Sequence, residues 1–264
     1  MNAATLTFGA WGALLVRDLR AFLRSRSQVF SSLALPLMLL GILGVGISDG
    51  LDPSLVRDGD YVTFLVPGIM VMTALFSSTF SSASFYQDRD SGMLKVFLVS
   101  PNSPAAILLG KSLGAVVIGS VQAIAVLAVA AAIPSINLQW QYGLIPSLLL
   151  ALLAILALNV FLSGLAQLLA SRIRTMQGFH LVMNIVLFPL LFFSGAFFLL
   201  NDLPGWLRGL ALANPLTYPV DLLQLSLYAD SGHGFLGVGV DLAVLLGLAV
   251  ALFGWGMRRH PMIE

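Results

Sequence analysis

Long apolar stretches, separated by short polar segments, dominate the hydrophobic pattern of this 264-residue chain. A helix needs about 20 mostly apolar residues to cross the hydrocarbon core of a bilayer. Stretches of this length predict six membrane-spanning helices, at residues 27–48, 61–84, 106–132, 143–170, 175–199 and 234–257. The third and fourth come from one uncharged run, which the turn-forming segment 133–143 divides. The pattern therefore predicts an all-α integral membrane protein with a single transmembrane domain over 1–264.

The first 26 residues predict a helix that lies along the membrane instead of crossing it. Apolar side chains recur every three or four positions and basic ones recur on another face: Phe8, Trp11, Leu15, Leu19 and Phe22, against Arg17, Arg20 and Arg24. This spacing is typical of an amphipathic interface helix whose apolar face meets lipid. Contact between this helix and a cytosolic partner is the alternative, and the sequence alone favours the plain membrane anchor.

Residues 200–232 predict a short hairpin that does not cross the membrane. Prolines at 204, 215 and 219 interrupt this apolar segment, so neither half is long enough to span. We expect two short amphipathic helices, broken at Asn214–Pro215, that dip into the outer leaflet and return; a hairpin on the surface is the alternative. Asp221 and Asp241 are expected near the outer boundary, where ionisation costs little.

The distribution of Lys and Arg predicts the orientation. With six spans, both ends of the chain lie on one side, and that side holds eleven of the thirteen basic residues. The other side holds Arg57 and Arg208 only. Because cytoplasmic segments are enriched in Lys and Arg, both termini are expected in the cytoplasm. The first apolar run follows four arginines and is expected to be retained as a span instead of being cleaved as a signal peptide.

Composition excludes several classes of protein. Hydrophobic residues make up 58% of the chain and charged residues 9%, against about 25% charged residues in soluble domains. The net charge of +1 gives no basic footprint for nucleic acid. Cysteine is absent and the three histidines are scattered, so no metal site is predicted.

The tripeptide Gly110-Lys111-Ser112 is similar to the end of a phosphate-binding loop. That motif requires a glycine at position 105, where this chain has Ala105, and it requires a strand and a turn before the helix. Here the segment from Pro104 reads as a helix already under way. No nucleotide site is therefore predicted, and Lys111 is expected to extend its ammonium group to the membrane interface.

Polar residues inside the predicted spans are candidates for a translocation path. They share one face of the fourth span, or lie along the fifth span and its end: Asn159, Ser163 and Gln167, then His180, Asn184 and Ser194. Polar groups in hydrocarbon need partners, so these faces should meet protein or water. For any single residue, hydrogen bonding between helices is favoured over contact with a transported molecule.

Residues 85–104, between the second and third spans, mix charges with an apolar patch at helical spacing. Met93 and Leu94 begin this patch, and Pro101 then stops the helix before Pro104 restarts it. One interpretation is a solvated loop that rests on the bilayer. The other is a short helix that fits a groove on a cytosolic protein and transmits force to the spans.

Two segments resemble hallmarks of the type-2 ATP-binding-cassette (ABC) export permeases. Residues 88–114, "DRDSGMLKVFLVSPNSPAAILLGKSLG", are similar to the family's loop, with an acidic helix, a "SP" pair and a "GK" that opens the third span. Residues 188–224, from "FPLLFFSG" to "NPLTYPVDLLQ", are similar to its second hallmark. Lys95 departs from the family, which often has an acidic residue there.

The resemblance implies a transporter in which two six-span permeases pair with two cytosolic ATPase subunits. ATP and Mg would be bound by the ATPase, and this chain would bind no cofactor. The loop 85–104 would couple the ATPase to the spans through Asp88, Arg89, Asp90, Gly92, Met93, Leu94, Lys95 and Pro101. The hairpin would form an outer gate near Asn214, Pro215 and Tyr218.

The sequence thus predicts the membrane-spanning subunit of an ABC exporter in a bacterial inner membrane, with a hydrophobic or amphipathic cargo such as a drug-like compound or lipid. A polysaccharide cargo is an alternative. A proton-coupled secondary transporter is disfavoured, because the centres of the spans lack charge. An intramembrane hydrolase is disfavoured too, because Ser194 lies about 21 Å from His180 along one helix, and neither Ser163 nor Ser194 lies in a G-x-S-x-G context.

Overall fold

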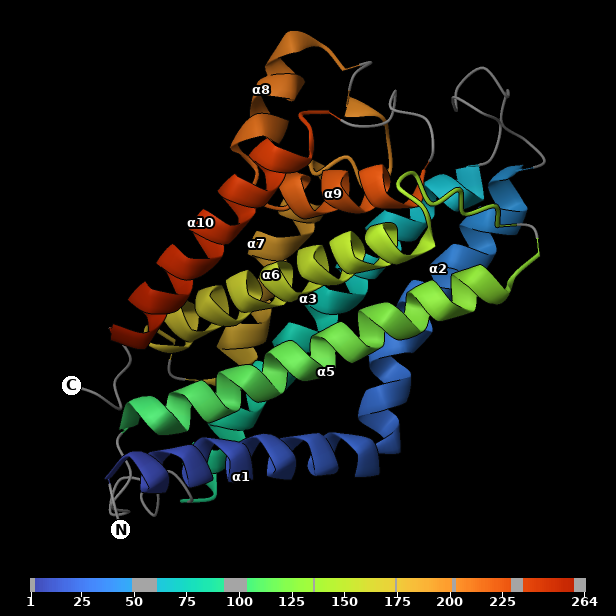
Figure 1. Ribbon diagram of the computed structural model, residues 1–264. Helices are drawn as coiled ribbons and strands as arrows, with labels where there is room; N and C mark the ends of the chain where they lie inside the picture. The colour runs from blue at the N-terminus through green and yellow to red at the C-terminus, as the bar shows by residue number, and fades with distance from the viewer. Residues whose placement is uncertain are drawn as a thin grey trace.

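The computed structural model describes residues 3–48, 61–92, 104–134, 136–173, 175–200, 203–228 and 235–258. These residues form helices joined by turns, without a strand in the described ranges (Figure 1). The helices are α1 (Ala3–Arg24), α2 (Arg26–Ser48), α3 (Tyr61–Asp90), α5 (Pro104–Ala132), α6 (Leu144–Ala170), α7 (Met176–Phe192), α8 (Gly205–Ala213), α9 (Thr217–Leu227) and α10 (Val238–Arg258). The predicted all-helical class is confirmed.

Six of these helices lie where spans were predicted and run back and forth between two ends of the bundle (Figure 1). Helices α3, α5, α6 and α10 each contain an apolar stretch long enough to cross a membrane. Helices α2 and α7 contain shorter apolar stretches, Val29–Ile42 and Met176–Phe192. Several apolar helices are therefore present, and the number of crossings stays a prediction.

The two ends of the bundle differ in what they contain. One end holds α1, the last turns of α3 and the first turns of α5 (Figure 1). We call it the loop end, because the predicted coupling loop connects α3 to α5 there. The other end holds α8, α9 and the first turn of α10, and we call it the hairpin end. Helix α10 runs from the hairpin end back toward the loop end.

Helix α1 packs on protein along one side, and the contact of its predicted apolar face with lipid stays a prediction. It runs alongside α5 (Figure 1), and Leu14 is buried there. A Cβ atom on Gly114 of α5 would lie 3.5 Å from the Cβ atom of Asp18, which is ordinary van der Waals contact. Exposed Val16 and Leu23 leave apolar surface for lipid on the same helix. The small residue at 114 thus allows α1 and α5 to approach closely within one chain.

Helix α7 ends at Phe192, seven residues before the predicted end of the fifth span. The chain then turns at Gly195, whose φ of 83° lies in the left-handed region that favours glycine. The Ser194 hydroxyl donates to the Leu191 carbonyl at 2.6 Å and helps to close the last turn. A glycine with positive φ therefore stops a stretch that hydropathy alone would continue.

The hairpin breaks where it was predicted to break, but its two helices differ. Helix α8 is largely exposed, with Trp206 on its surface. Helix α9 is almost wholly buried against α3, α6 and α10. The expectation of two amphipathic helices thus holds for α8 and is wrong for α9, because α9 has protein on all sides.

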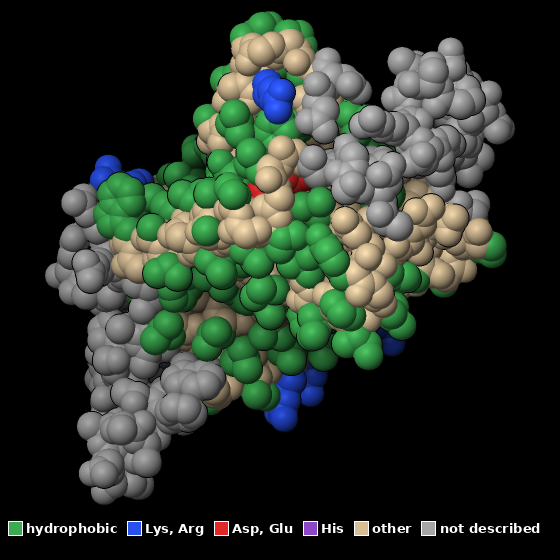
Figure 2. All heavy atoms as spheres, turned by 45° about the horizontal axis from the view of Figure 1, so that its top comes forward, with side chains coloured by type: hydrophobic (Ala, Val, Ile, Leu, Met, Phe, Trp, Pro, Cys, Tyr) green, Lys and Arg blue, Asp and Glu red, His purple; other side chains and the backbone are tan. Residues whose placement is uncertain are grey.

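The outer surface of the bundle is strongly apolar. Large side chains such as Ile145, Ile185 and Val250 are exposed on α6, α7 and α10. Figure 2 shows hydrophobic side chains over much of the face in view, with few basic side chains among them. A soluble protein rarely exposes so wide an apolar area, and lipid tails can cover one at no cost.

Candidate functional site

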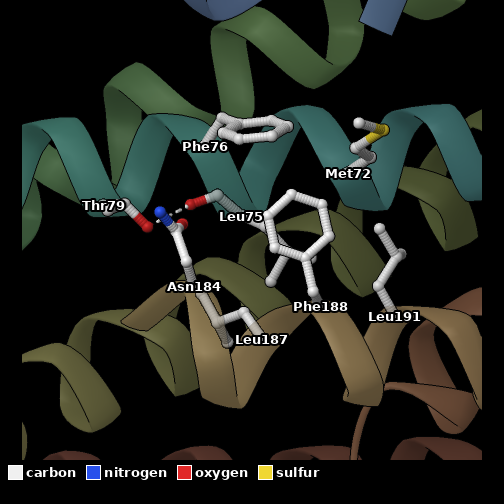
Figure 3. A pocket seen from close by; sticks show the side chains of 8 residues that line it. All are labelled: Met72, Leu75, Phe76, Thr79, Asn184, Leu187, Phe188 and Leu191. Atoms are coloured by element: carbon white, nitrogen blue, oxygen red, sulfur yellow. Dashed lines mark hydrogen bonds between the residues drawn. The ribbon is translucent and has the colours of Figure 1, made fainter. Parts of the chain in front are cut away.

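The described residues form a narrow, half-open pocket between α3 and α7, with about 250 Å³ of space between the atoms when the adjoining open space is counted (Figure 3). Its lining residues are Met72, Leu75, Phe76, Thr79, Asn184, Leu187, Phe188 and Leu191. Both helices contribute positions i, i+3, i+4 and i+7, which lie on one face of an α-helix. The cavity therefore lies between two helix faces whose lining residues have the same spacing.

The walls of this cavity are aromatic and aliphatic. The rings of Phe76 and Phe188 meet edge to face, with centroids 6.0 Å apart at an interplanar angle of 72°. The Thr79 hydroxyl donates to the Leu75 carbonyl at 2.9 Å, the bond dashed in Figure 3, so its proton is already engaged. The exposed Asn184 amide is the other polar group of the lining. Such a site suits an apolar ligand with few polar groups.

Two of the predicted path residues on α6 make hydrogen bonds to α5 instead of lining the cavity. Asn159 donates to Ser120 Oγ at 3.4 Å and to the Ile155 carbonyl at 2.9 Å. Gln167 donates to Ser112 Oγ. These bonds between helices are the interpretation that the sequence favoured for single residues. Ser163, between them on the same helix, is buried.

The three predicted path residues from the fifth span lie in different surroundings. Asn184 lines the cavity, whereas the ring of His180 meets the edge of Phe179 with centroids 5.9 Å apart. Ser194 is fully buried at the turn after α7. Asn184 is thus the member of the predicted set that the structure brings to the cavity. The apolar lining residues on α3 and α7 were not predicted as a site, because the sequence does not say which helix packs against α7.

A second site lies at the loop end, where charged side chains from α1, α3 and α5 meet. Arg17 Nη2 lies 2.9 Å from Asp88 Oδ2 and 2.7 Å from Asp18 Oδ1. Lys111 Nζ pairs with the same Asp88 carboxylate and donates to Ser84 Oγ at 3.3 Å. We call these residues, Arg17, Asp18, Asp88 and Lys111, the charged cluster. Asp88 joins α3 to both α1 and α5.

Burial increases the electrostatic attraction between Asp88 and Lys111, because little water screens the two charges. The Lys111 side chain is 8% exposed and that of Asp88 14%, so the expectation that Lys111 extends to the interface is wrong; a nearby carboxylate satisfies it inside the protein. Burial alone would raise the pKa of Asp88, but Arg17 and Lys111 outweigh burial and lower it below its usual 3.8. Asp88 therefore stabilises the fold above its unfolded pKa, and this contribution disappears as the pH falls through the lower folded value.

Tyr86 extends the same junction toward α7. Its buried ring contacts Phe179, with centroids 5.3 Å apart, and its hydroxyl donates to the Ile173 carbonyl at 3.0 Å. The last two turns of α3 are thereby connected to α1, α5 and the α6–α7 link.

The predicted coupling residues fall partly on this junction. Asp88 lies in the charged cluster, and Arg89 and Asp90 complete α3. Gly92 has a φ of 75°, as is usual just after a helix end. Met93, Leu94, Lys95 and Pro101 lie outside the described residues. The role of this set in coupling stays a prediction.

The predicted outer-gate residues form the corner between α8 and α9. Asn214 donates to the Leu190 carbonyl at 2.5 Å and accepts a bond from Leu216 N at 3.0 Å. The Tyr218 hydroxyl donates to the Leu212 carbonyl at 2.7 Å. Pro215 occupies the turn between the two helices. The Asn214 bond to Leu190 connects the hairpin to α7, and the other two bonds close the corner itself. The role of this corner as a gate stays a prediction.

Comparison with known proteins identifies the class. The family model for ABC-2 type transporters matches residues 9–228, so the chain belongs to the ABC-2 type transporter family. It is 28% identical over 169 residues to "Probable multidrug ABC transporter permease YbhR" of Escherichia coli (strain K12), covering 62% of this chain and 44% of that protein.

Other relatives are found outside E. coli. The chain is 32% identical over 179 residues to the ycf38 protein of Cyanophora paradoxa, covering 67% of this chain and 60% of that protein. It is 25% identical over 263 residues to the daunorubicin resistance ABC transporter permease protein DrrB1 of Streptomyces coeruleorubidus, covering 98% and 86%. The matches to ycf38 and YbhR thus span about half the length of those relatives.

Proposed function

We propose that this chain is the membrane-spanning permease subunit of an ATP-driven exporter, and that it moves a hydrophobic or amphipathic molecule out of the cytoplasm or the inner leaflet. The observation that supports this most is the apolar cavity between α3 and α7. A separate cytosolic ATPase would bind ATP and Mg and supply the energy. The names of two relatives, a multidrug permease and a daunorubicin resistance permease, are consistent with such a cargo.

The cavity lining favours an aromatic or aliphatic cargo over a polysaccharide. A sugar chain presents many hydroxyl groups, each of which loses free energy if it leaves water without a hydrogen-bond partner. Six of the eight lining side chains are apolar, and the Thr79 hydroxyl already has an acceptor. The rings of Phe76 and Phe188, which meet edge to face, offer aromatic surface to a flat ring system.

Two partners follow from this proposal. A second copy of the chain would cover the open side of the cavity and the exposed apolar face of α7, which includes Leu181 and Ile185. A cytosolic ATPase, itself paired, would contact the loop end, where segment 93–103 leaves α3 and returns to α5. Membrane lipid would cover the remaining apolar surface.

Daunorubicin is a suitable probe for the cavity, because it is a fluorescent amphipathic molecule with a flat aromatic system. Phe76→Ala and Phe188→Ala should each weaken its binding to the purified protein about tenfold, which is about 1.4 kcal/mol, because each removes an aromatic wall. Phe192→Ala is the matched control, since Phe192 lies on α7 outside the lining. Fluorescence titration in detergent measures the affinity. Equal affinities for all four proteins would contradict a cargo site between α3 and α7.

The proposed location is a bacterial inner membrane with the loop end in the cytoplasm. Arg17, Arg20, Arg24, Arg26 and Lys111 lie at this end, and Arg208 lies at the hairpin end. Because the chain has no cysteine, single cysteines report on the two sides cleanly. A membrane-impermeant maleimide added to intact cells should label Trp206→Cys, and it should label Arg20→Cys only after permeabilisation. The reverse pattern would overturn this orientation.

A further inference from the structure

Two buried carboxyl groups lie at the hairpin end, where α9 meets α10. Asp221, on α9, is 2% exposed, and Asp241, in the first turn of α10, is 0% exposed. Helix α9 packs on α10, and Asp221 accepts bonds from backbone N–H groups just before α10, so the two carboxyl groups lie at the same contact between helices. Both groups are placed at one end of the bundle, but they are buried, so the expectation that their ionisation costs little is wrong.

The two carboxyl groups have different hydrogen-bond environments. Asp221 accepts two backbone bonds, from Phe235 N at 2.7 Å and from Leu236 N at 2.9 Å. Both oxygens of Asp241 lack a donor among the described residues. A carboxylate that accepts N–H bonds is stabilised in its charged form, and a buried carboxylate without them is not. The geometry thus favours charge on Asp221 and a proton on Asp241.

Neighbouring elements supply little positive charge to offset a second carboxylate. Helix α6, which packs on both α9 and α10, has no titratable residue between Leu144 and Ala170. On α9, the Tyr218 hydroxyl donates to a backbone carbonyl. On α8, the Arg208 guanidinium lies 5.0 Å from the centre of the Phe235 ring. Neither carboxyl has an ion pair within the ranges that the structure describes. Figure 2 shows acidic atoms as a small patch enclosed by other side chains.

We propose that Asp221 and Asp241 form a binding site for one proton, and that this shared proton holds α9 against the start of α10. With the proton present, the Asp241 carboxyl donates to the Asp221 carboxylate and connects the two helices. Without it, two carboxylates in a nonpolar environment repel each other and lose hydration, as in other carboxyl pairs that share a proton. Loss of the proton would loosen the hairpin from α10. This inference is independent of the proposed cargo and of ATP.

Infrared spectroscopy tests the site directly, because a protonated carboxyl has a C=O stretching band that a carboxylate lacks. Wild-type protein at neutral pH should show such a band, and it should shift when the protein is made with ¹³C-labelled aspartate, which needs no substitution. Asp241→Asn should remove the band, and Asp221→Asn should shift or remove it. Asp88→Asn is the matched control and should leave the band unchanged, because Asp88 is ion-paired. A wild-type protein without an aspartate-derived band at neutral pH would overturn the proposal.

The pH dependence of stability tests the consequence for the hairpin. A carboxyl whose folded form retains its proton binds more protons in the folded state than in the unfolded state, so stability falls as the pH rises above the ordinary carboxyl pKa of about 3.9. Asp241→Asn keeps a donor toward Asp221 at every pH. Its melting temperature should therefore fall less than that of wild type between about pH 5 and about pH 9, a range that lies wholly above that value. The same slope for both proteins would contradict a proton that holds α9 to α10.

Discussion

Replacing Asp88 by Asn is expected to reduce export at least tenfold while the assembled transporter continues to hydrolyse ATP. Asp88 is the shared partner of Arg17 and Lys111, and it lies directly before the predicted coupling loop. Without its charge, α1 and α5 lose their ionic connection to the end of α3, and Lys111 is left buried without a counter-charge. Removing one partner of a buried ion pair costs about 3 kcal/mol. The measurement is the number of ATP molecules hydrolysed for each daunorubicin molecule transported into proteoliposomes.

Two further variants separate coupling from stability. Asp88→Asn combined with Lys111→Met leaves no buried ammonium and should recover most of the lost melting temperature, but not the coupling ratio, because α3 and α5 remain unconnected. Arg20→Gln changes an exposed charge on α1 and should behave like wild type. If Asp88→Asn keeps the wild-type ratio of ATP to cargo, the charged cluster has no role in coupling.

Substituting Gly164 by Leu is expected to displace α10 from α6. A Cβ atom at position 164 would lie 2.5 Å from the backbone nitrogen of Phe253 and 2.7 Å from its Cα. These atoms belong to the α10 backbone, so no side-chain rotation can relieve the contact. Overpacking typically costs about 1–3 kcal/mol, and here the whole helix must move. Melting of the detergent-solubilised protein should occur several degrees lower than in wild type, and Gly164→Ala should fall between the two.

The control for this substitution lies on α10 itself. A Cβ atom on Gly247 would meet nothing within 4 Å. Gly247→Leu adds the same side chain to an open position, so it should leave the melting temperature near that of wild type or raise it slightly. Equal losses in the two variants would mean that α6 and α10 do not approach each other as closely as described.

The positions of most helices and of one corner could be predicted, because each depends on apolar runs and turn-forming residues that are close together in the sequence. Apolar runs and the break at 133–143 gave helices close to α3, α5 and α6. The Asn214–Pro215 pair marked the corner between α8 and α9, because proline has no backbone N–H to donate to a helical hydrogen bond. The end of α7 was missed, since Gly195 lies in an apolar stretch whose hydropathy does not reveal a positive φ.

The sites depended on which helix faces meet, and a single sequence contains little of that information. From the sequence, Lys111 is expected at the membrane interface, because nothing in the sequence shows that α3 places Asp88 beside it. Asp221 and Asp241 are twenty residues apart in sequence, and α9 must fold back on α10 before they meet. The stripes 72–79 and 184–191 each fit an ordinary buried helix face, and they define a cavity only as a pair.

Transport by purified components tests the central claim most directly. Proteoliposomes that contain this chain together with its ATPase, purified as a complex from the native membrane, should take up daunorubicin only when ATP and Mg are added on the ATPase side. Proteoliposomes with this chain alone should show no uptake under the same conditions. Uptake by the chain alone, or uptake by the complex without ATP, would contradict the view that this protein provides the membrane path and a separate ATPase drives it.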